Sequence, residues 1–411
     1  MKSPISRGRI SHSLLSEIGW LLRAFGSTLS DSEKVVEAEI AFAKYVGRER
    51  CVVFPFARTA IWATLRALKL PKGSRILLPP LTIKPILDVV VHLGFEPIFV
   101  DLNPTTACFD EEELQQAMAR QPSVAILTYL FGLVPNVESL LGVLRDNNVF
   151  VIEDFSQCLN GEYEGRKIGT FGDVSIYSAS SVKTFDTFGG GFAVTDDSVL
   201  AEALSVAQGT LREPKRSLVL QSILRNVVRN LASSRLIFPL ATYWLLRLAA
   251  RKSTQAVGRF TGARSTEPLS ELPIDWFRRY SSLQAQVALR ELPKVKERDM
   301  ERVSRMGQVI ELSGDLDRPR GADGQRHVYW QFIVYVDNFP RAREHLAQHA
   351  VDCATTSLVL LTALPKYPGQ TPTPVATRLY ERGVYLPCYH QLRVWEVRRI
   401  ARALRALFTS P

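Results

Sequence analysis

Short apolar runs alternate with helix-like segments between Cys51 and Val194, and this alternation constrains the fold more than any other feature of the chain. A strand buried on both faces is apolar along its whole length, whereas an amphipathic helix repeats its apolar residues every three or four positions. The alternation therefore predicts an α/β fold: a mostly parallel central sheet covered by helices on both faces. Ligands of such sheets bind beyond the carboxyl ends of the strands. The predicted strands are Cys51–Phe54, Ile76–Leu78, Ile98–Asp101, Val124–Leu127, Val149–Ile152, Val174–Tyr177 and Gly191–Val194, with helices at Thr59–Leu70, Pro85–Leu93, Asp110–Arg120 and Val137–Asn147.

The last part of the chain has a different pattern. It predicts a smaller C-terminal α+β domain over residues 292–411, after a large domain over residues 1–291 that begins with an N-terminal helical segment. The elements predicted in the smaller domain are helices at Lys294–Ile310, Arg341–Ala350 and Val394–Leu407 and a strand at Val328–Tyr335.

A basic, apolar segment interrupts the large domain, and we predict a helical insert over residues 207–266. From Pro214 to Thr266 the chain has ten Lys or Arg residues and no acid, and the net charge of the whole protein is +10. Basic amphipathic helices bind anionic membranes, so residues 215–252 predict peripheral membrane contact, with Tyr243 and Trp244 at headgroup level. The alternatives are helices packed on the core, covering a dimer interface or closing the active site. Nucleic acid is not expected as a partner, because the segment has few aromatic residues for base stacking.

The cysteines and the apolar segments indicate the compartment. The five cysteines are odd in number and form no C-x-x-C pair, and the six histidines have no metal-ligand spacing. We therefore expect neither disulfides nor a metal site, and predict a cytoplasmic protein, peripheral at the inner face of the membrane. The most apolar segment, Leu236–Leu246, contains Pro239 and lies between Arg235 and Arg247, so it is too broken to span a bilayer.

Two residues beside predicted strands have types suited to chemistry. Asp154 follows the strand Val149–Ile152, where a carboxylate either caps a turn or keeps a heterocyclic nitrogen protonated. Lys183 lies between the last two predicted strands, ahead of Gly189–Gly191, three glycines that permit close backbone approach to a ligand. Such a lysine is either a solvated surface residue or, where burial lowers its pKa, a nucleophile toward carbonyl groups.

A third candidate is the start of the first predicted helix. Arg58 and Thr59 stand there, directly after a strand. Free N–H groups at a helix N-terminus and an adjacent cation suit a phosphate. The alternative is that Thr59 is simply the N-cap of the helix.

In order and spacing, these residues resemble the DegT/DnrJ/StrS family of sugar-nucleotide aminotransferases that depend on pyridoxal 5'-phosphate (PLP). The resemblance covers most of the chain outside the basic insert. The residues that carry it are Phe56–Ala60, Leu78–Thr82, Gly94–Asp101, Val151–Gln157, Gly169–Asp173, Ser178–Lys183, Gly189–Gly191, Arg279–Ala285 and Leu386–His390.

The resemblance implies the fold of the type I PLP-dependent transferases and a role for each site residue. Lys183 would bind PLP covalently and then move protons. Asp154 would pair with the ring nitrogen, and Gln157 would lie close to the ring and its 3-hydroxyl. Ser178 would bind the phosphate, together with the backbone around Arg58 and Thr59.

The resemblance also implies the reaction and the partners. The chain would move an amino group from a donor, glutamate, to a keto sugar that is linked to a nucleotide or a lipid, in the synthesis of amino sugars or surface polysaccharides. Its active sites would lie at the interface of a homodimer.

This chain departs from the family pattern around the expected pocket. Ile83 replaces the aromatic residue that stacks on the ring, and Phe277 stands where the partner subunit would supply an asparagine. Thr356–Ser357 replaces a His-Tyr pair of the substrate loop. These departures leave a second interpretation open: a PLP-binding regulatory or scaffold protein with little transferase activity. A dehydratase is disfavoured, because family members that dehydrate are expected to carry His at the position of Lys183.

Overall fold

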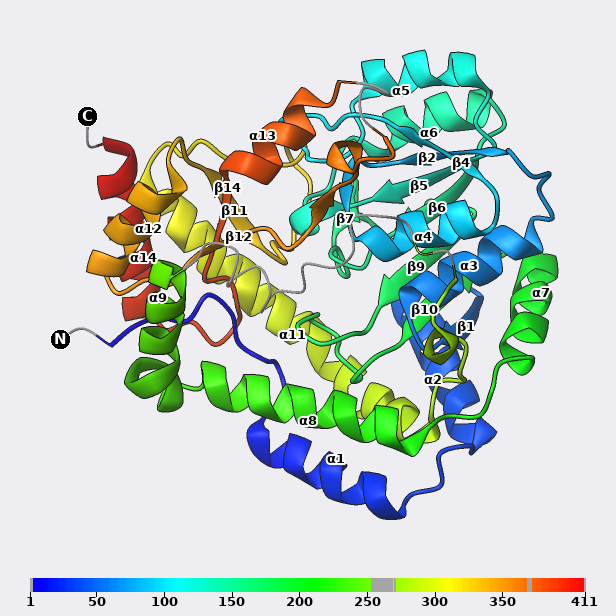
Figure 1. Cartoon of the computed structure of the whole chain (residues 1–411), viewed down its shortest axis with the longest axis horizontal. Helices are drawn as coiled ribbons and strands as arrows, with labels where there is room; N and C mark the ends of the chain where they lie inside the picture. The colour runs from blue at the N-terminus through cyan, green and yellow to red at the C-terminus, as the bar shows by residue number, and fades with distance from the viewer. Residues whose placement is uncertain (1–2, 253–268, 270, 368–371, 410–411) are drawn as a thin grey trace.

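The computed structural model describes residues 3–252, 269, 271–367 and 372–409 and is built around a seven-stranded sheet (Figure 1). Strand β10 runs antiparallel to its neighbours β1 and β9, and the other strand pairs of this sheet are parallel. The predicted α/β fold with a mostly parallel sheet is therefore confirmed. The strand order is β1 (Arg50–Phe54), β10 (Gly191–Thr195), β9 (Val174–Ser178), β6 (Phe150–Asp154), β5 (Val124–Thr128), β2 (Arg75–Leu78) and β4 (Glu96–Phe99).

Alternate side chains of the strands enter two separate cores. In β5, Ala125 and Leu127 face one core, whereas Val124 and Ile126 face the other. This is the two-residue period of a strand that is buried on both faces. The first core is covered by α2 (Ser32–Val46), α5 (Glu111–Ala117), α6 (Val137–Asp146) and the start of α11 (Ser282–Ser313), and the second by α3 (Ala57–Ala67), α4 (Lys84–His92) and α7 (Ser198–Gly209).

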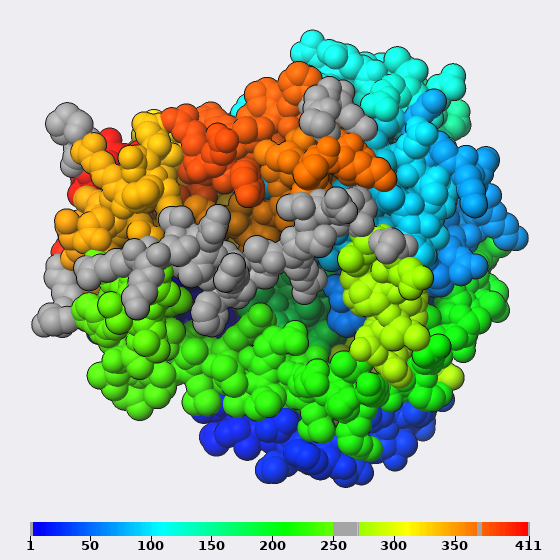
Figure 2. Space-filling model, in the orientation of Figure 1, coloured from blue at the N-terminus to red at the C-terminus, as the bar shows by residue number. Residues whose placement is uncertain are grey.

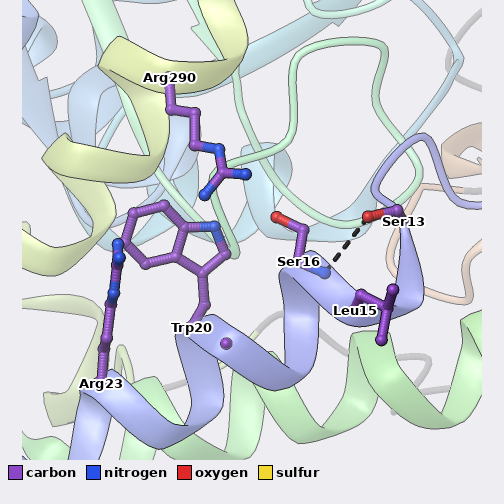
Figure 3. A pocket seen from close by; sticks show the side chains of 7 residues that line it. Ser13, Leu15, Ser16, Trp20, Arg23 and Arg290 are labelled. Carbon is purple, nitrogen blue, oxygen red and sulfur yellow. Dashed lines mark hydrogen bonds between the residues drawn. The ribbon is translucent and has the colours of Figure 1, made fainter.

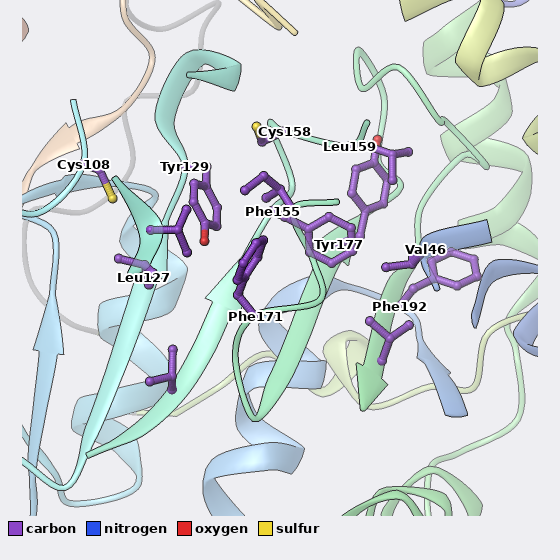
Figure 4. Close-up of a cluster of buried hydrophobic side chains, with 14 of the residues drawn as sticks. Val46, Cys108, Leu127, Tyr129, Phe155, Cys158, Leu159, Phe171, Tyr177 and Phe192 are labelled. Carbon is purple, nitrogen blue, oxygen red and sulfur yellow. The ribbon is translucent and has the colours of Figure 1, made fainter. Parts of the chain in front are cut away.

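Aromatic rings fill the first core beneath the carboxyl ends of β6 and β9 (Figure 4). The ring of Phe42 on α2 lies 4.5 Å from that of Phe192 and 5.8 Å from that of Tyr177, measured between centroids. Phe155 and Tyr177 are 5.5 Å apart. These two residues adjoin Asp154 and Ser178 in the chain, so close packing of large rings fixes the strand ends that carry the candidate site.

A second, antiparallel sheet follows in the order β11 (Phe332–Tyr335), β14 (Gly383–Leu386) and β12 (Ala354–Thr355), with α12 (Phe339–Gln348), α13 (Pro374–Arg382) and α14 (Val394–Thr409) around it. The predicted strand Val328–Tyr335 is wrong in its first half. Tyr329 has a φ of 46°, a left-handed conformation that extended pairing does not allow, so β11 begins only at Phe332.

Helix α11 runs without interruption through the boundary predicted at residue 291, so one long helix serves both parts of the chain. The division into domains at that residue stays a prediction. Two short ribbons complete the described strands: β3 (Leu81–Thr82) pairs with β13 (Val359–Leu360), and β7 (Glu162–Tyr163) pairs with β8 (Arg166–Lys167).

The basic insert is helical in its described part, which comprises α8 (Arg216–Ser233), the π-helical turn η3 (Phe238–Thr242) and α9 (Tyr243–Lys252). Its residues 253–266 lie outside the described part of the chain. Helix α8 buries Val219, Ile223 and Val227 in a core shared with α1 (Leu14–Gly26) and α11. In Figure 2, α8 and α9 (green) lie between α1 (blue) and the C-terminal part of the chain (orange).

Helix α1 is fixed to α11 by a tryptophan between two arginines (Figure 3). The Trp20 ring is buried, with the guanidinium of Arg23 4.9 Å and that of Arg290 5.7 Å from its centroid. A cation over an aromatic face adds about 0.5–2 kcal/mol to the packing of such a ring. The helix therefore forms a firm support for α8. Within the described ranges, no helix combines the length and the apolar character that crossing a bilayer requires.

Candidate active site

The candidate site lies at the carboxyl edge of the parallel strands. Asp154 is the last residue of β6 and Ser178 the last of the neighbouring strand β9. Helix α3 begins three residues after β1 ends, at the same edge of the sheet. The prediction that Asp154 ends a buried strand is confirmed, and its side chain is only 8% exposed. Parallel topology thus brings together residues that are far apart in the chain.

Ser156 joins the two strand ends. Its backbone N–H donates to Asp154 Oδ1 at 3.1 Å, and its hydroxyl accepts from the Ser178 N–H at 3.0 Å. The Ser178 hydroxyl lies 3.2 Å from that of Ser180. Ser156 was not among the predicted site residues. Its position two residues after a strand-end aspartate, typical of an Asx turn, is the signal that marks it.

Lys183 lies in the loop between β9 and β10, and its amine is 3.8 Å from the centroid of the Trp330 ring. Burial lowers the pKa of Lys183 to about 8, and the Asp154 carboxylate acts in the opposite direction. Burial also raises the pKa of Asp154, while hydrogen bonds from Ser156 and the charge of Lys183 lower it. The result is an amine that is partly neutral near pH 8, close to a buried carboxylate.

Trp330 is the second residue that the sequence did not reveal. Its indole N–H donates to the Val182 carbonyl at 3.1 Å, and Val182 itself has a φ of 71°. The indole thus holds the backbone immediately before Lys183 while its face contacts the amine. Trp330 was hidden inside a predicted strand, where an aromatic residue suggests only core packing.

The basic insert braces the loop that carries Lys183. Asn226 of α8 is fully buried, accepts a hydrogen bond from the Ser181 hydroxyl and donates to Asp186 Oδ2 at 2.6 Å. His12 of the N-terminal arm (residues 3–13) donates to the Asp186 carbonyl at 2.8 Å. The buried segment of α8 is therefore a packing element at the site, in agreement with the alternative that the insert covers the core.

Helix α11 holds the same loop from the other side. Arg302 is buried, forms an ion pair with Asp299 at 2.7 Å and donates to the Thr184 hydroxyl at 3.2 Å. It also donates to the Val328 carbonyl at 2.9 Å, two residues before Trp330. One guanidinium thus ties the residue after Lys183 to the segment that carries its aromatic neighbour.

The N-terminus of α3 abuts the glycine run. A Cβ on Gly191 would lie 2.3 Å from the Ala57 nitrogen, so only glycine allows β10 to pass this close. The glycine that was expected to allow close approach of a ligand thus allows close approach of the backbone at Phe56 and Ala57. The N-cap of α3 is Phe56, and its side chain makes no capping hydrogen bond. The interpretation of Thr59 as the N-cap is therefore wrong: its buried hydroxyl donates to the Trp276 carbonyl at 2.8 Å.

The other predicted site residues contact neighbouring parts of the chain. The Arg58 guanidinium lies between two rings, 3.9 Å from the centroid of Phe56 and 4.3 Å from that of Trp276. Gln157 accepts a hydrogen bond from the Phe131 N–H at 2.7 Å, which fixes a residue with a φ of 60°. Ile83 precedes α4 and is 42% exposed.

Comparison with known proteins identifies the architecture around this site. The model of the DegT/DnrJ/EryC1/StrS aminotransferase family matches residues 16–219 and 265–405, which is well over half of the chain. The chain belongs to the DegT/DnrJ/EryC1/StrS aminotransferase family. The match leaves out residues 220–264, so most of the basic insert has no counterpart in the family pattern.

Individual relatives of this DegT-family chain are sugar-modifying enzymes. It is 29% identical over 182 residues to a GDP-perosamine synthase of Caulobacter vibrioides, covering 44% of this chain and 49% of that protein. It is 24% identical over 399 residues to a UDP-N-acetyl-3-dehydro-alpha-D-glucosamine 3-aminotransferase of Acidithiobacillus ferrooxidans, covering 95% of this chain and 93% of that one. The chain spans about half the length of this synthase and of two further curated relatives that it matches.

Among solved structures, an aminotransferase from Psychrobacter cryohalolentis has the same fold. It superposes with a TM-score of 0.76 at 17% identity and covers 98% of this chain and 99% of that one. The predicted fold class is therefore confirmed for the described part of this DegT-family chain.

The lowered pKa of Lys183 predicts how the reaction of its amine with an added aldehyde such as PLP depends on pH. Only the neutral amine attacks an aldehyde, so the rate of the reaction with PLP should rise with pH, with a midpoint at about 8. The Asp154→Asn variant should shift this midpoint downward, because the carboxylate raises the pKa of Lys183. Stopped-flow absorbance measures the rate. The exposed Asp146→Asn serves as the control. A midpoint near 10.5, the ordinary lysine value, would contradict this description of the site.

Proposed function

We propose that the chain is a PLP-dependent aminotransferase that moves an amino group from glutamate to a keto sugar carried on a nucleotide or a lipid. The observation that carries the proposal is the Lys183 amine, with its pKa lowered to about 8, close to the buried carboxylate of Asp154. Family membership and the sugar-modifying relatives support the same reaction. The products of such a reaction are amino sugars of the kind used in surface polysaccharides.

The residues present fit PLP. Lys183 would hold it covalently, Asp154 would face the ring nitrogen, and Gln157 and Ile83 would lie nearest the ring. The Ser178 hydroxyl and the N–H groups that open α3, next to Arg58 and Thr59, suit its phosphate. PLP supplies an electron sink when it is bound. Asp154 would keep a proton on the ring nitrogen, and Lys183 Nζ, with a pKa of about 8, could both accept and return a proton.

A PLP-binding regulator with little transferase activity is the second candidate function. The specific observation in its favour is that Phe277 packs inside its own subunit, with its ring 4.8 Å from that of Trp62, and offers no polar group to a phosphate. The two candidates differ in whether amino donors react with the loaded protein. Assembly into a homodimer stays a prediction from the family.

We also propose that only the end of the insert contacts an anionic membrane. Leu236, Leu240 and Leu245 are 69%, 73% and 65% exposed. Tyr243, which we placed at headgroup level, is instead buried, so that part of the expectation is wrong. Flotation with anionic vesicles that weakens at high salt is the expected result. Equal flotation with neutral and anionic vesicles, or no flotation at all, would contradict the proposed contact with an anionic membrane.

The Asp154→Asn variant tests the reaction itself. Its amide cannot hold the proton on the ring nitrogen, although its oxygen can still accept from the Ser156 N–H. The half-reaction with glutamate, followed by the loss of PLP absorbance, should slow by a factor on the order of a thousand. Asp146→Asn should react at the wild-type rate. A wild-type protein that takes up PLP but reacts with no common amino acid would favour the regulator.

A further inference from the structure

A pocket of about 250 Å³ lies between α1 and α11, and its described lining contains no residue of the candidate active site. Ser16, Gly19 and Trp20 of α1 line it, and Arg290 of α11 stands opposite (Figure 3). Small-molecule sites occupy about 300–1,000 Å³. This pocket is therefore too small for a sugar on its nucleotide carrier, and it suits a group of a few atoms.

Two polar atoms in the pocket wall are buried and have no hydrogen-bond partner among the described residues. They are the indole N–H of Trp20, a side chain that is only 2% exposed, and the Ser16 hydroxyl. Figure 3 shows the indole nitrogen on the side of the ring that faces Ser16 and the Arg290 guanidinium. Buried polar groups are normally paired, because an unpaired one has lost its hydrogen bonds to water. The indole N–H can only donate, so the group that satisfies it must be an acceptor.

Two arginines make the pocket positively charged. The guanidinium groups of Arg23 and Arg290 both lie near the Trp20 ring, and neither forms an ion pair with a described carboxylate. Glu17, the only acid of α1, accepts a hydrogen bond from α8 at 3.0 Å and does not line the pocket. Glu291 of α11 accepts hydrogen bonds from two other cations of its own helix. An anion in the pocket would therefore meet two arginines that the nearby acids leave unpaired.

The backbone of α1 also favours an anion. Ser13 is the N-cap, and its hydroxyl accepts from the Ser16 N–H at 3.2 Å, so the positive end of the helix dipole lies at the pocket. Gly19 keeps the pocket open, because a Cβ there would meet no neighbouring element within 4 Å. Glycine inside a helix lowers stability relative to alanine. Here it leaves room beside the unpaired donors.

We propose that this pocket binds a phosphate group, with the Arg290 guanidinium and the Trp20 indole N–H as its main ligands. A guanidinium can donate parallel hydrogen bonds to two phosphate oxygens, and a third oxygen can then accept from the indole N–H or the Ser16 hydroxyl. Inorganic phosphate and a small phosphate monoester share this chemistry. The inference goes beyond the proposed function and does not depend on it, because the pocket and the candidate active site have no described residue in common.

A bound phosphate would also stabilise the support of the Lys183 loop. Trp20 packs in one core with Ile223 of α8 and with Phe188, which follows Lys183 in the same loop. A ligand that binds only the folded protein raises its stability as the site fills. Phosphate should therefore raise the unfolding temperature of the full-length protein.

Calorimetric titration at constant ionic strength tests the inference with three probes: inorganic phosphate, glycerol 3-phosphate and chloride. The full-length protein is first treated with PLP, so that any cofactor site is filled. At least one phosphate probe should bind at a saturable site, and chloride should not. Trp20→Phe keeps an aromatic ring but loses the N–H, and Arg290→Met keeps an apolar stem but loses the charge. Each should weaken the binding about tenfold, and the tighter phosphate probe identifies the source of the group.

Two matched variants serve as controls. Trp395 is an exposed tryptophan with the Arg399 guanidinium 4.7 Å from its ring centroid, and Lys296 is an exposed cation of α11. Neither residue lines the pocket. Trp395→Phe and Lys296→Met should therefore each change the affinity by less than about twofold.

Gly19→Leu provides an independent test, because it keeps every proposed ligand and fills the pocket. It should abolish phosphate binding and the rise in unfolding temperature, while circular dichroism shows the helix content unchanged. Wild-type affinity in Trp20→Phe or in Gly19→Leu would contradict the inference. Equal losses in the two control variants, equal binding of chloride, or no saturable binding of either phosphate probe would also contradict it.

Discussion

The site depends on one loop, which must hold a partly neutral lysine beside a buried carboxylate. The loop leaves β9 and returns as β10, and its ends are joined by hydrogen bonds from the Ala179 N–H to Gly190 and from the Thr187 N–H to Ala179. This closure alone does not determine where Lys183 points. Burial of the amine costs free energy, so the surrounding structure must supply rigid contacts that keep it in place.

Those contacts come from elements that lie far from the loop in sequence. Asn226 of the insert, His12 of the N-terminal arm and Arg302 of α11 each form a hydrogen bond to the loop. Each group is buried and forms hydrogen bonds inside the protein, where an unpaired polar atom would be costly. The insert therefore supports the Lys183 loop through α8, whatever its other end contacts. This explains how a segment that the family pattern lacks can be accommodated beside a family active site.

The sequence alone was sufficient to predict the central sheet and part of the candidate site. Apolar runs predicted the strands, and the end of the run Val149–Ile152 placed Asp154 at a carboxyl edge, because parallel topology leaves few other arrangements. The sequence alone did not reveal Trp330 or Arg302. Both form contacts between distant segments, and neither an aromatic residue in an apolar run nor an arginine in a charged helix has a distinctive local pattern. The prediction that Thr59 caps its helix was wrong for a related reason. Its hydroxyl donates a hydrogen bond to the carbonyl of Trp276, more than two hundred residues later.

The identity of the lysine that binds the cofactor is the central claim of this account. Borohydride reduction of the PLP-loaded protein, followed by peptide mass spectrometry, tests it most directly, because reduction fixes the cofactor to the amine that holds it. The account predicts a phosphopyridoxyl group on the peptide that contains Lys183 and no labelled protein in the Lys183→Ala variant. A label on another lysine, or a wild-type protein that takes up no PLP, would contradict it.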